Sequence, residues 1–230
     1  MTQSSAEGPA AATVRRAKVL VVDDHPLLRE GVVQLINRQP DLICCGEADT
    51  LLATTSAIEI HGAEVVLLDL RLGSGDTLEW IKTARTGFPQ VSILVLSQHD
   101  EALYAERALR AGASGYVMKQ EASQDVVHAI RTVLAGELYV SRKMTPLILR
   151  KLLKTDAAKD GTLAELSNRE MQVFQLLGSG LGSRQIAEQL DLSIKTIETH
   201  RENIKRKIGL KNAPQLIQHA THWVQHSSRP

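Results

Sequence analysis

The sequence predicts two domains: an α/β domain built on a doubly wound, five-stranded parallel sheet, and then an all-α domain of four helices. Three observations predict them. Five short apolar runs alternate with stretches of helical spacing up to about residue 138, and only helical spacing follows residue 161. The charge also divides, because residues 1–140 hold 12 Lys/Arg against 18 Asp/Glu, a net of −6, whereas residues 141–230 hold 15 against 8, a net of +7.

The parallel sheet is predicted because the apolar runs do not alternate with polar residues. A strand covered by helices on both faces is apolar on both faces, and helices of about a dozen residues suit parallel crossovers. The expected strands are 18–22, 42–46, 65–68, 92–96 and 114–118, and the expected helices are 26–38, 51–60, 76–86, 100–111 and 123–135.

Caps and glycines delimit the helices of the second part. Ser167 opens the capping box S-N-R-E, with Glu170 at the third helical position, and Gly178 and Gly180 end that helix. Further helices are expected over 183–190, from about 194 to 208, and after Asn212.

The connection between the two parts is predicted from its polarity. An amphipathic stretch over 146–154 runs into a polar segment that suits a linker. The expected division is a disordered leader over 1–16, an α/β domain over 17–138, a linker over 139–161 and a helical domain over 162–227.

Composition narrows the class of protein. The chain is 43% hydrophobic and 23% charged, as in ordinary soluble domains. No apolar stretch approaches the roughly 18 to 20 residues that span a bilayer, and the N-terminus lacks the pattern of a secretory signal. The adjacent Cys44 and Cys45 suit neither a disulfide nor a zinc site, so we expect buried thiols in a cytoplasmic protein.

Polar side chains follow the predicted strands at the edge where open α/β sheets bind ligands. Asp23 and Asp24 follow the first strand, Asp69 the third, Ser97 the fourth and Lys119 the fifth. Three carboxylates at one edge repel one another unless a divalent cation joins them, and oxygen ligands suit Mg²⁺. With the Lys119 ammonium and the Ser97 hydroxyl, the set suits a phosphoryl group on Asp69.

Two neighbouring features have simpler explanations. Taken alone, Asp24 would cap a helix that Pro26 opens. His25 is expected to shape the loop rather than bind metal, since the eight histidines show no metal-ligand spacing.

In order, spacing and strand position, these residues resemble the receiver domain of two-component response regulators, over residues 17 to about 138. The resemblance implies a flavodoxin-like fold in which Asp69 accepts a phosphoryl group from a sensor histidine kinase. It implies that Asp24 binds Mg²⁺ directly, that Asp23 binds it through water, and that the backbone carbonyl of Arg71 completes the protein ligands.

The resemblance also assigns the residues that respond to phosphorylation. Ser97 is the switch hydroxyl, Lys119 the phosphate partner, and Tyr116 the aromatic residue that turns inward on activation. The loop after Asp69 departs from the family pattern, with Gly73 and Thr77 in place of the usual Pro and Gly.

The stretch 183–210 has the layout of a helix-turn-helix, a helix, a short turn and a longer helix. The longer helix buries an isoleucine stripe and spans about 22 Å, enough to lie in a major groove. The side chains expected to face DNA are Lys195, Thr196, Glu198, Thr199, Arg201, Glu202, Lys205 and Arg206. For Glu198 we favour an ion pair within the helix over a base contact.

From Leu166 to about Val224 this part resembles the LuxR-type DNA-binding domain, and with a receiver it defines the NarL/FixJ family. The family implies a transcription regulator, not an enzyme beyond its own phosphoryl transfer and dephosphorylation, that binds promoter DNA as a homodimer on activation. It also implies that the unphosphorylated receiver masks the DNA-binding helix.

Two alternatives stay open. One is a phosphorylation-independent DNA-binding regulator with a degenerate, interaction-only receiver. The other is a phosphatase with Asp69 as nucleophile, although Arg71 stands where its acid catalyst would be needed.

Overall fold

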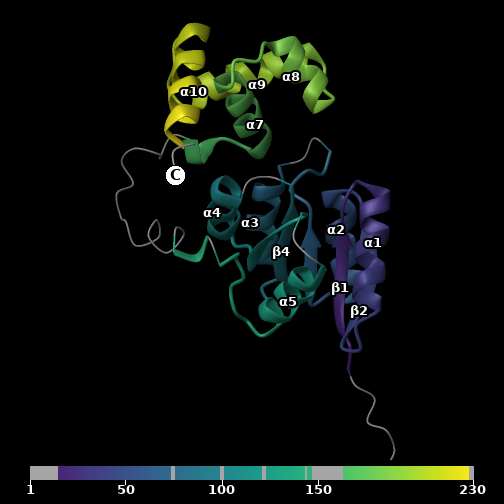
Figure 1. Ribbon diagram of the computed structural model, residues 1–230. Coiled ribbons are helices and arrows are strands. Elements are labelled where there is room, and N and C mark those ends of the chain that lie inside the picture. The colour runs from purple at the N-terminus through teal and green to yellow at the C-terminus, as the bar shows by residue number, and fades with distance from the viewer. Residues whose placement is uncertain are drawn as a thin grey trace, which may run out of the picture.

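The computed structural model describes residues 15–73, 76–98, 101–120, 123–142, 144–146 and 163–227. Its first part is a five-stranded parallel sheet in the order β2-β1-β3-β4-β5, the order of flavodoxin-like doubly wound folds (Figure 1). The strands are β1 (Ala17–Val22), β2 (Leu42–Ala48), β3 (Val65–Leu68), β4 (Ser92–Ser97) and β5 (Gly115–Met118). Each expected strand is confirmed to within two residues.

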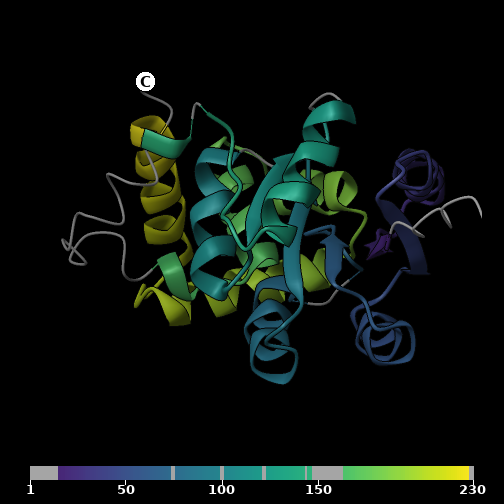
Figure 2. The ribbon, with the colours of Figure 1, turned by 90° about the horizontal axis from the view of Figure 1, so that it is seen from below.

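Helices cover both faces of this sheet (Figure 2). They are α1 (Pro26–Asn37), α2 (Leu51–His61), α3 (Thr77–Gly87), α4 (Glu101–Ala111) and α5 (Ser123–Leu134). Helices α1 and α5 pack with Val19 and Val21 of β1, whereas α2, α3 and α4 pack with Leu20 and Val22. Successive residues of one strand therefore enter two different cores, which explains why the strands are apolar without alternation.

Local sequence sets where the helices begin. Thr50 accepts a hydrogen bond from the backbone N–H of Ala53 at the start of α2, and Asp76 caps α3 in the same way. At α1, Pro26 takes the first helical position and the cap is His25, whose side chain makes no capping bond. The explanation of Asp24 as a helix cap is therefore wrong.

The second part of the described chain is helical, as expected. A turn of 3-10 helix (Leu163–Glu165) precedes α7 (Asn168–Gly178), α8 (Ser183–Leu190), α9 (Ile194–Lys207) and α10 (Ala213–Ser227). Both hydrogen bonds of the Ser167–Glu170 capping box are present. The left-handed backbone of Asp191, with φ of 52°, makes the turn between α8 and α9.

Two of the sequence-based expectations concern residues that the structure does not describe. Residues 1–14 of the expected leader and 147–154 of the expected helix before the linker lie outside the described residues. Among the helices that are described, none is long and apolar enough to cross a membrane.

The segment that follows α5 returns along the sheet. The backbone N–H of Tyr116 in β5 donates to the carbonyl of Tyr139, at 2.9 Å. Two residues later, the backbone N–H and the hydroxyl of Ser141 donate to the buried carboxylate of Glu101, at 2.7 and 2.5 Å. The chain leaving the α/β part is thus fixed to β5 and to the first residue of α4.

Helix α7 lies against α4, so the second part sits over this side of the sheet (Figure 1). The Tyr104 hydroxyl donates to Gln175 Oε1 at 3.2 Å, and Arg107 donates to the carbonyl of Leu166. Arg169 Nη2 donates to the carbonyl of Gly73, at 3.3 Å. Besides these hydrogen bonds, the two parts share an apolar cluster that includes Tyr104 and Ala108 of α4 and Leu166 and Met171 of the second part.

Candidate functional site

Lys119 joins two buried carboxylates at the carboxyl edge of the sheet. Asp23 and Asp69 follow the neighbouring strands β1 and β3, and the Lys119 Nζ atom lies 2.6 Å from Asp23 Oδ2 and 2.8 Å from Asp69 Oδ2. At most 5% of any of these three side chains is exposed. The backbone N–H of Lys119 donates to the carbonyl of Ser97, so the ends of β4 and β5 hold the lysine in place.

Burial makes ionisation of Asp69 costly. It raises the pKa of Asp69, the charge and hydrogen bond of Lys119 oppose that shift, and the negative charge of Asp23 adds to it. Three carboxylates (Asp23, Asp24 and Asp69) and one ammonium give the cluster a formal charge of −3 + 1 = −2. This excess charge is what a divalent cation would balance.

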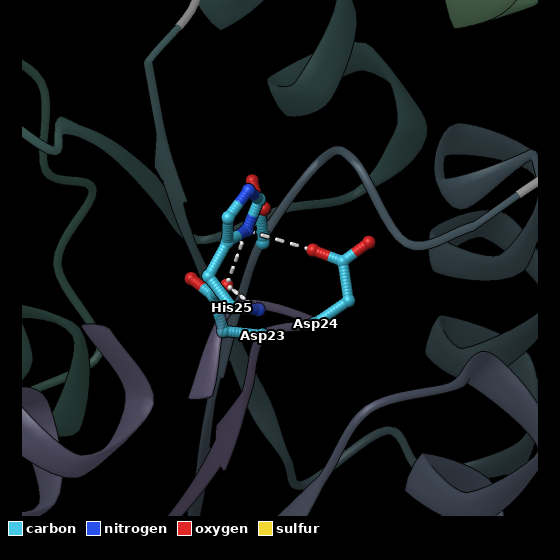
Figure 3. A group of neighbouring side chains, drawn as sticks. Asp23, Asp24 and His25 are labelled. Atoms are coloured by element: carbon cyan, nitrogen blue, oxygen red, sulfur yellow. Dashed lines mark hydrogen bonds and ion pairs between the residues drawn. The ribbon is translucent and has the colours of Figure 1, made fainter. Parts of the chain in front are cut away.

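His25 lies over the two adjacent carboxylates (Figure 3). Its Nδ1 atom is 2.8 Å from Asp24 Oδ1 and 3.0 Å from Asp23 Oδ1, and its backbone N–H also donates to Asp23 Oδ1. The other Asp24 oxygen accepts from the backbone N–H of Gly73 in the loop after β3, at 3.3 Å. Asp24 is therefore tied to both loops that border Asp69.

A cavity of about 180 Å³ opens above Asp69, lined by His25, Asp69, Arg71, Ser97, Gln98 and Lys119. The cavity brings together the predicted acceptor, hydroxyl and ammonium, together with His25 and Gln98, which the sequence did not indicate. Ser97 is fully buried and lines this cavity.

Tyr116 is fully buried, with none of its surface exposed. Packing of the side chain beside β4 and the returning segment at Tyr139 accounts for its burial.

The predicted DNA-reading helix is α9, and its outer face is open. Ser193 caps the helix by accepting from the backbone N–H of Thr196, and Ile197 and Ile204 are fully buried against the other helices. The exposed side chains of the predicted set are Lys195, Glu198, Thr199, Glu202 and Arg206. The α/β part therefore leaves this face uncovered, which differs from the masking that the family resemblance implies.

Ion pairs within α9 involve both of its carboxylates. Glu198 Oε1 lies 3.0 Å from Arg201 Nη1, as favoured from the sequence, and Glu202 Oε1 lies 2.8 Å from Lys205 Nζ. Arg206, four residues after Glu202, donates instead to Asn203 Oδ1.

Arg201 faces inward in this structure. Only 16% of its side chain is exposed, and Nη1 donates to the Ser183 hydroxyl at the start of α8, at 2.5 Å. The helix-turn-helix angle directs this guanidinium between the two helices, and Lys205 of the predicted set is as little exposed, at 16% of its side chain, whereas the remaining predicted side chains lie at the surface or are half-buried.

Sequence reasoning missed the contacts between the two parts. Tyr104, Arg107 and Arg169 carry the hydrogen bonds that dock α7, and each was an ordinary helical residue in the sequence. No local pattern marks them, because their partners are 59 to 96 residues away.

Comparison with known proteins agrees with this architecture. Residues 19–131 match the family described as "Response regulator receiver domain", and residues 164–220 match "Bacterial regulatory proteins, luxR family". The chain is 33% identical to the oxygen regulatory protein NreC of Staphylococcus aureus (strain MRSA252) over 210 residues, 88% of this chain and 96% of that protein.

Solved structures give the same result. RcsB from Salmonella enterica serovar Typhimurium, bound to promoter P1flhDC with the phosphomimetic BeF3-, is 27% identical with a TM-score of 0.55, covering 90% of this chain and 100% of that one. The receiver domain of a putative response regulator NarL from Mycobacterium tuberculosis is 32% identical with a TM-score of 0.51, covering 54% of this chain and 99% of that one.

Fold, carboxylate site and helix-turn-helix define a two-component response regulator that joins a receiver to a LuxR-type DNA-binding domain and controls DNA binding through phosphorylation. The chain belongs to the NarL/FixJ family of these regulators. Membership implies a histidine kinase and DNA as the classes of partner.

Proposed function

We propose that Asp69 accepts a phosphoryl group from a sensor histidine kinase in a Mg²⁺-dependent step, and that this controls promoter binding by α9. The observation that carries the proposal is the Lys119 ammonium, shared by the buried carboxylates of Asp23 and Asp69 beside the cavity. The domain division 17–138, 139–161 and 162–227 belongs to the same proposal and is supported by the ends of α5 and the start of the helical part at Leu163.

The donor set fits Mg²⁺. Asp23, Asp24 and Asp69 offer carboxylate oxygens within 4.8 Å of one another, and the cluster carries excess negative charge. Asp24 and Asp69 would bind the cation directly, Asp23 through water, and the carbonyl of Arg71 would complete the protein ligands. When bound, Mg²⁺ neutralises charge on the phosphoryl oxygens.

The transfer itself needs an ionised and oriented Asp69. A carboxylate oxygen of Asp69 attacks phosphorus, and the bond between phosphorus and the kinase imidazole nitrogen breaks as the new P–O bond forms. Lys119, held by the end of β5, stabilises the charge on the phosphoryl oxygens, and the Ser97 hydroxyl donates to one of them.

The output passes to the DNA-binding part through the contacts of α4 and α7. Phosphorylation at Asp69 repositions Ser97 and Lys119, whose strands lead into α4 and into the segment fixed at Ser141. The outer face of α9 is already exposed, so phosphorylation does not need to uncover it. Instead, release of α7 from α4 changes how two copies of the chain place their α9 helices on paired half-sites of DNA. RcsB, which is similar to this chain, has been solved as dimers bound to DNA.

Intact-protein mass after treatment with a small phosphodonor tests the acceptor. The comparison is wild type with Asp69→Asn, with and without Mg²⁺, and with Asp125→Asn, which removes an exposed carboxyl on α5, as the matched control. Wild type and Asp125→Asn should each gain one phosphoryl group only with Mg²⁺, and Asp69→Asn should gain none. A phosphoryl group on Asp69→Asn, or none on wild type with Mg²⁺, would overturn the assignment.

DNA binding of the same samples tests the output. Phosphorylated wild type should retain duplex DNA from a random-sequence pool more strongly than the unphosphorylated chain. Equal retention would favour the phosphorylation-independent regulator.

A further inference from the structure

We propose that Arg201 is a positioning residue of the helix-turn-helix, which holds the start of α8 on α9 through Ser183 instead of reading a DNA base. This role rests on the proposed function, because it concerns promoter binding by α9. It deepens that function by assigning one predicted DNA contact to the frame that supports the reading helix. Arg201 thereby leaves the set of residues that determines base preference.

The position of Arg201 on α9 is that of a buried residue. It follows Ile197 by four residues and precedes Ile204 by three, a spacing that places all three side chains on one face of a helix. Both isoleucines are fully buried, and only 16% of the Arg201 side chain is exposed. Lys195 and Arg206 lie on a different face of α9 and are exposed. Arg201 therefore belongs to the packed side of the helix and not to its outer side.

Two contacts hold the guanidinium between α8 and α9, which are neighbours in the helix-turn-helix (Figure 1). Arg201 Nη1 donates to the hydroxyl of Ser183, the first residue of α8, at 2.5 Å, and the same nitrogen lies 3.0 Å from Glu198 Oε1. The bond to Ser183 joins the two helices, and Glu198, one turn earlier on α9, braces the guanidinium from its own helix. Hydrogen bonds with a charged donor are stronger than neutral ones, which suits this bond to fixing the angle between two helices.

These contacts occupy the atoms that a base would need. Arginine reads guanine with two N–H groups of its planar fork. In Arg201, Nη1 is engaged with Ser183 and Glu198, and Nε is buried without a hydrogen-bond partner among the residues that the structure describes. Turning the side chain outward to a base would break the bond to α8 and leave Glu198 unpaired. The arrangement therefore favours a structural frame over base reading.

The same pair explains why a carboxylate stands on a helix that meets DNA phosphates. An unpaired Glu198 carboxylate, half of which is exposed, would be repelled by the phosphates. Its charge is offset by Arg201, so the pair adds no net charge to this side of α9. Glu198 thus serves the position of Arg201, and the outward cations of α9 are left to attract DNA.

The experiment measures duplex DNA binding by the full chain, with and without the small phosphodonor, and uses a random-sequence duplex pool as the probe. Arg201→Met keeps the aliphatic stem, Ser183→Ala removes the hydroxyl, and Ser183→Thr keeps it. Arg206→Met removes an arginine from the exposed face of the same helix and is the matched control. Both arginine variants are also combined with Ser183→Ala. Titration gives the affinity, sequencing of the retained duplexes gives the base preference, and urea unfolding without DNA shows that each chain is folded under the binding conditions.

Arg201→Met and Ser183→Ala should each lose about tenfold in affinity, equally for all retained sequences and with the base preference of wild type, because both break the bond that orients α9. Their combination should lose no more than about twofold beyond Arg201→Met alone, since the two changes remove one contact. Ser183→Thr should bind as wild type does. The losses of Arg206→Met and Ser183→Ala should add, because Arg206 acts on the other face.

Three results would overturn this role for Arg201. They are a base preference that relaxes at one position in Arg201→Met, losses of Arg201→Met and Ser183→Ala that simply add, and wild-type affinity in Ser183→Ala. Failure of wild type to retain duplex DNA under either condition would instead overturn promoter binding by α9. In that case, a lack of coupling between the Arg201 and Ser183 changes in urea unfolding would overturn the bond between the helices as well.

Discussion

At the scale of single residues, one ammonium group offsets the charge of two buried carboxylates. Lys119 Nζ lies within 2.8 Å of both Asp23 and Asp69, and all three side chains are shielded from water. Removing one partner of such a cluster leaves uncompensated buried charge, which typically costs about 3 to 5 kcal/mol. The raised pKa of Asp69, caused first by burial, reflects the same cost.

Lys119→Met tests this role without leaving a large cavity. We expect the variant to lose about 3 kcal/mol of unfolding free energy in metal-free buffer, because Asp23 and Asp69 then face each other without a cation. Added Mg²⁺ should raise the midpoint of urea unfolding more in the variant than in wild type, since binding to the native state stabilises it. Identical midpoints and identical Mg²⁺ responses in the two chains would contradict this role for Lys119.

The residues of the carboxylate site were predictable because each directly follows a strand whose position the apolar runs reveal. Strand order then brings Asp23, Asp69 and Lys119 to one edge without any knowledge of side-chain contacts. The contact of His25 with Asp23 and Asp24 was not predictable in this way. It depends on the rotamer of one side chain in a two-residue turn, which carries no periodic signal. The same holds for Arg201, which the helix-turn-helix angle directs toward Ser183.

At the scale of elements, close packing of helices limits which residues are tolerated. A Cβ atom at Gly178, the last residue of α7, would collide with the backbone carbonyl of Ala220 and lie 2.6 Å from Val224 Cγ2 in α10. Backbone cannot yield as a flexible side chain can, so these helices approach closely only with glycine at this position.

Gly178→Ala should therefore destabilise the DNA-binding part by about 1 to 3 kcal/mol, the usual range for overpacking. Gly31→Ala is the matched control, because Gly31 lies on the exposed side of α1, where a Cβ atom would meet nothing within 4 Å, and alanine there should stabilise by up to about 1 kcal/mol. Thermal unfolding by circular dichroism measures both changes. Similar small effects at the two sites would show that α7 and α10 can separate without cost.

A second contact between elements depends on pH. Arg131 on α5 donates to both carboxylate oxygens of Asp41, at 2.7 and 2.8 Å, and lies between α5 and the turn before β2. This hydrogen bond lowers the pKa of Asp41 below 3.8. Because the folded-state pKa is depressed, the pair stabilises the fold above pH 3.8, and the contribution is lost as the pH falls through the lowered pKa.

Asp41→Asn should accordingly cost up to about 1 kcal/mol at pH 7, a small value because both side chains are more than one-third exposed. The difference from wild type should shrink as the pH falls below 3.8, where Asp41 becomes protonated in the wild type too. Urea unfolding at a series of pH values measures the difference in unfolding free energy between wild type and the variant. A difference that stays constant into acid would mean that the charge of Asp41 contributes nothing to stability.

Elements with a strong local signal were predicted closely, and those without one were missed. Helix α8 occupies 183–190 as expected, because a polar face and an apolar face repeat at helical period, and α7 follows its capping box. The return of the chain along β5 was not expected. It is held by the backbone of Tyr139 and by the bonds of Ser141 to Glu101, and neither requires an apolar run.

At the scale of the whole molecule, a polar contact between the two domains reaches the carboxylate site. Arg169 of α7 donates to the carbonyl of Gly73, and the N–H of Gly73 donates to Asp24. The positive φ of Gly73, 51°, lets this short loop serve both partners. Burial, followed by the charge of Arg71, lowers the pKa of Arg169, whereas Asp24 opposes that shift. The charge of a cation at Asp24 would therefore act against the docking of Arg169.

If a cation at Asp24 weakens docking of the DNA-binding domain, docking must weaken cation binding by the same factor, because coupling between two binding events is reciprocal. Arg169→Ala removes the docking hydrogen bond, so it should raise the Mg²⁺ affinity of the full chain by about fivefold, the equivalent of about 1 kcal/mol for one hydrogen bond. Calorimetry measures the affinity. Arg184→Ala serves as the control, since that exposed arginine on α8 pairs with Glu188 on its own helix and should leave Mg²⁺ binding unchanged. If Arg169→Ala binds Mg²⁺ no more tightly than the control, Gly73 does not transmit docking to the carboxylate site.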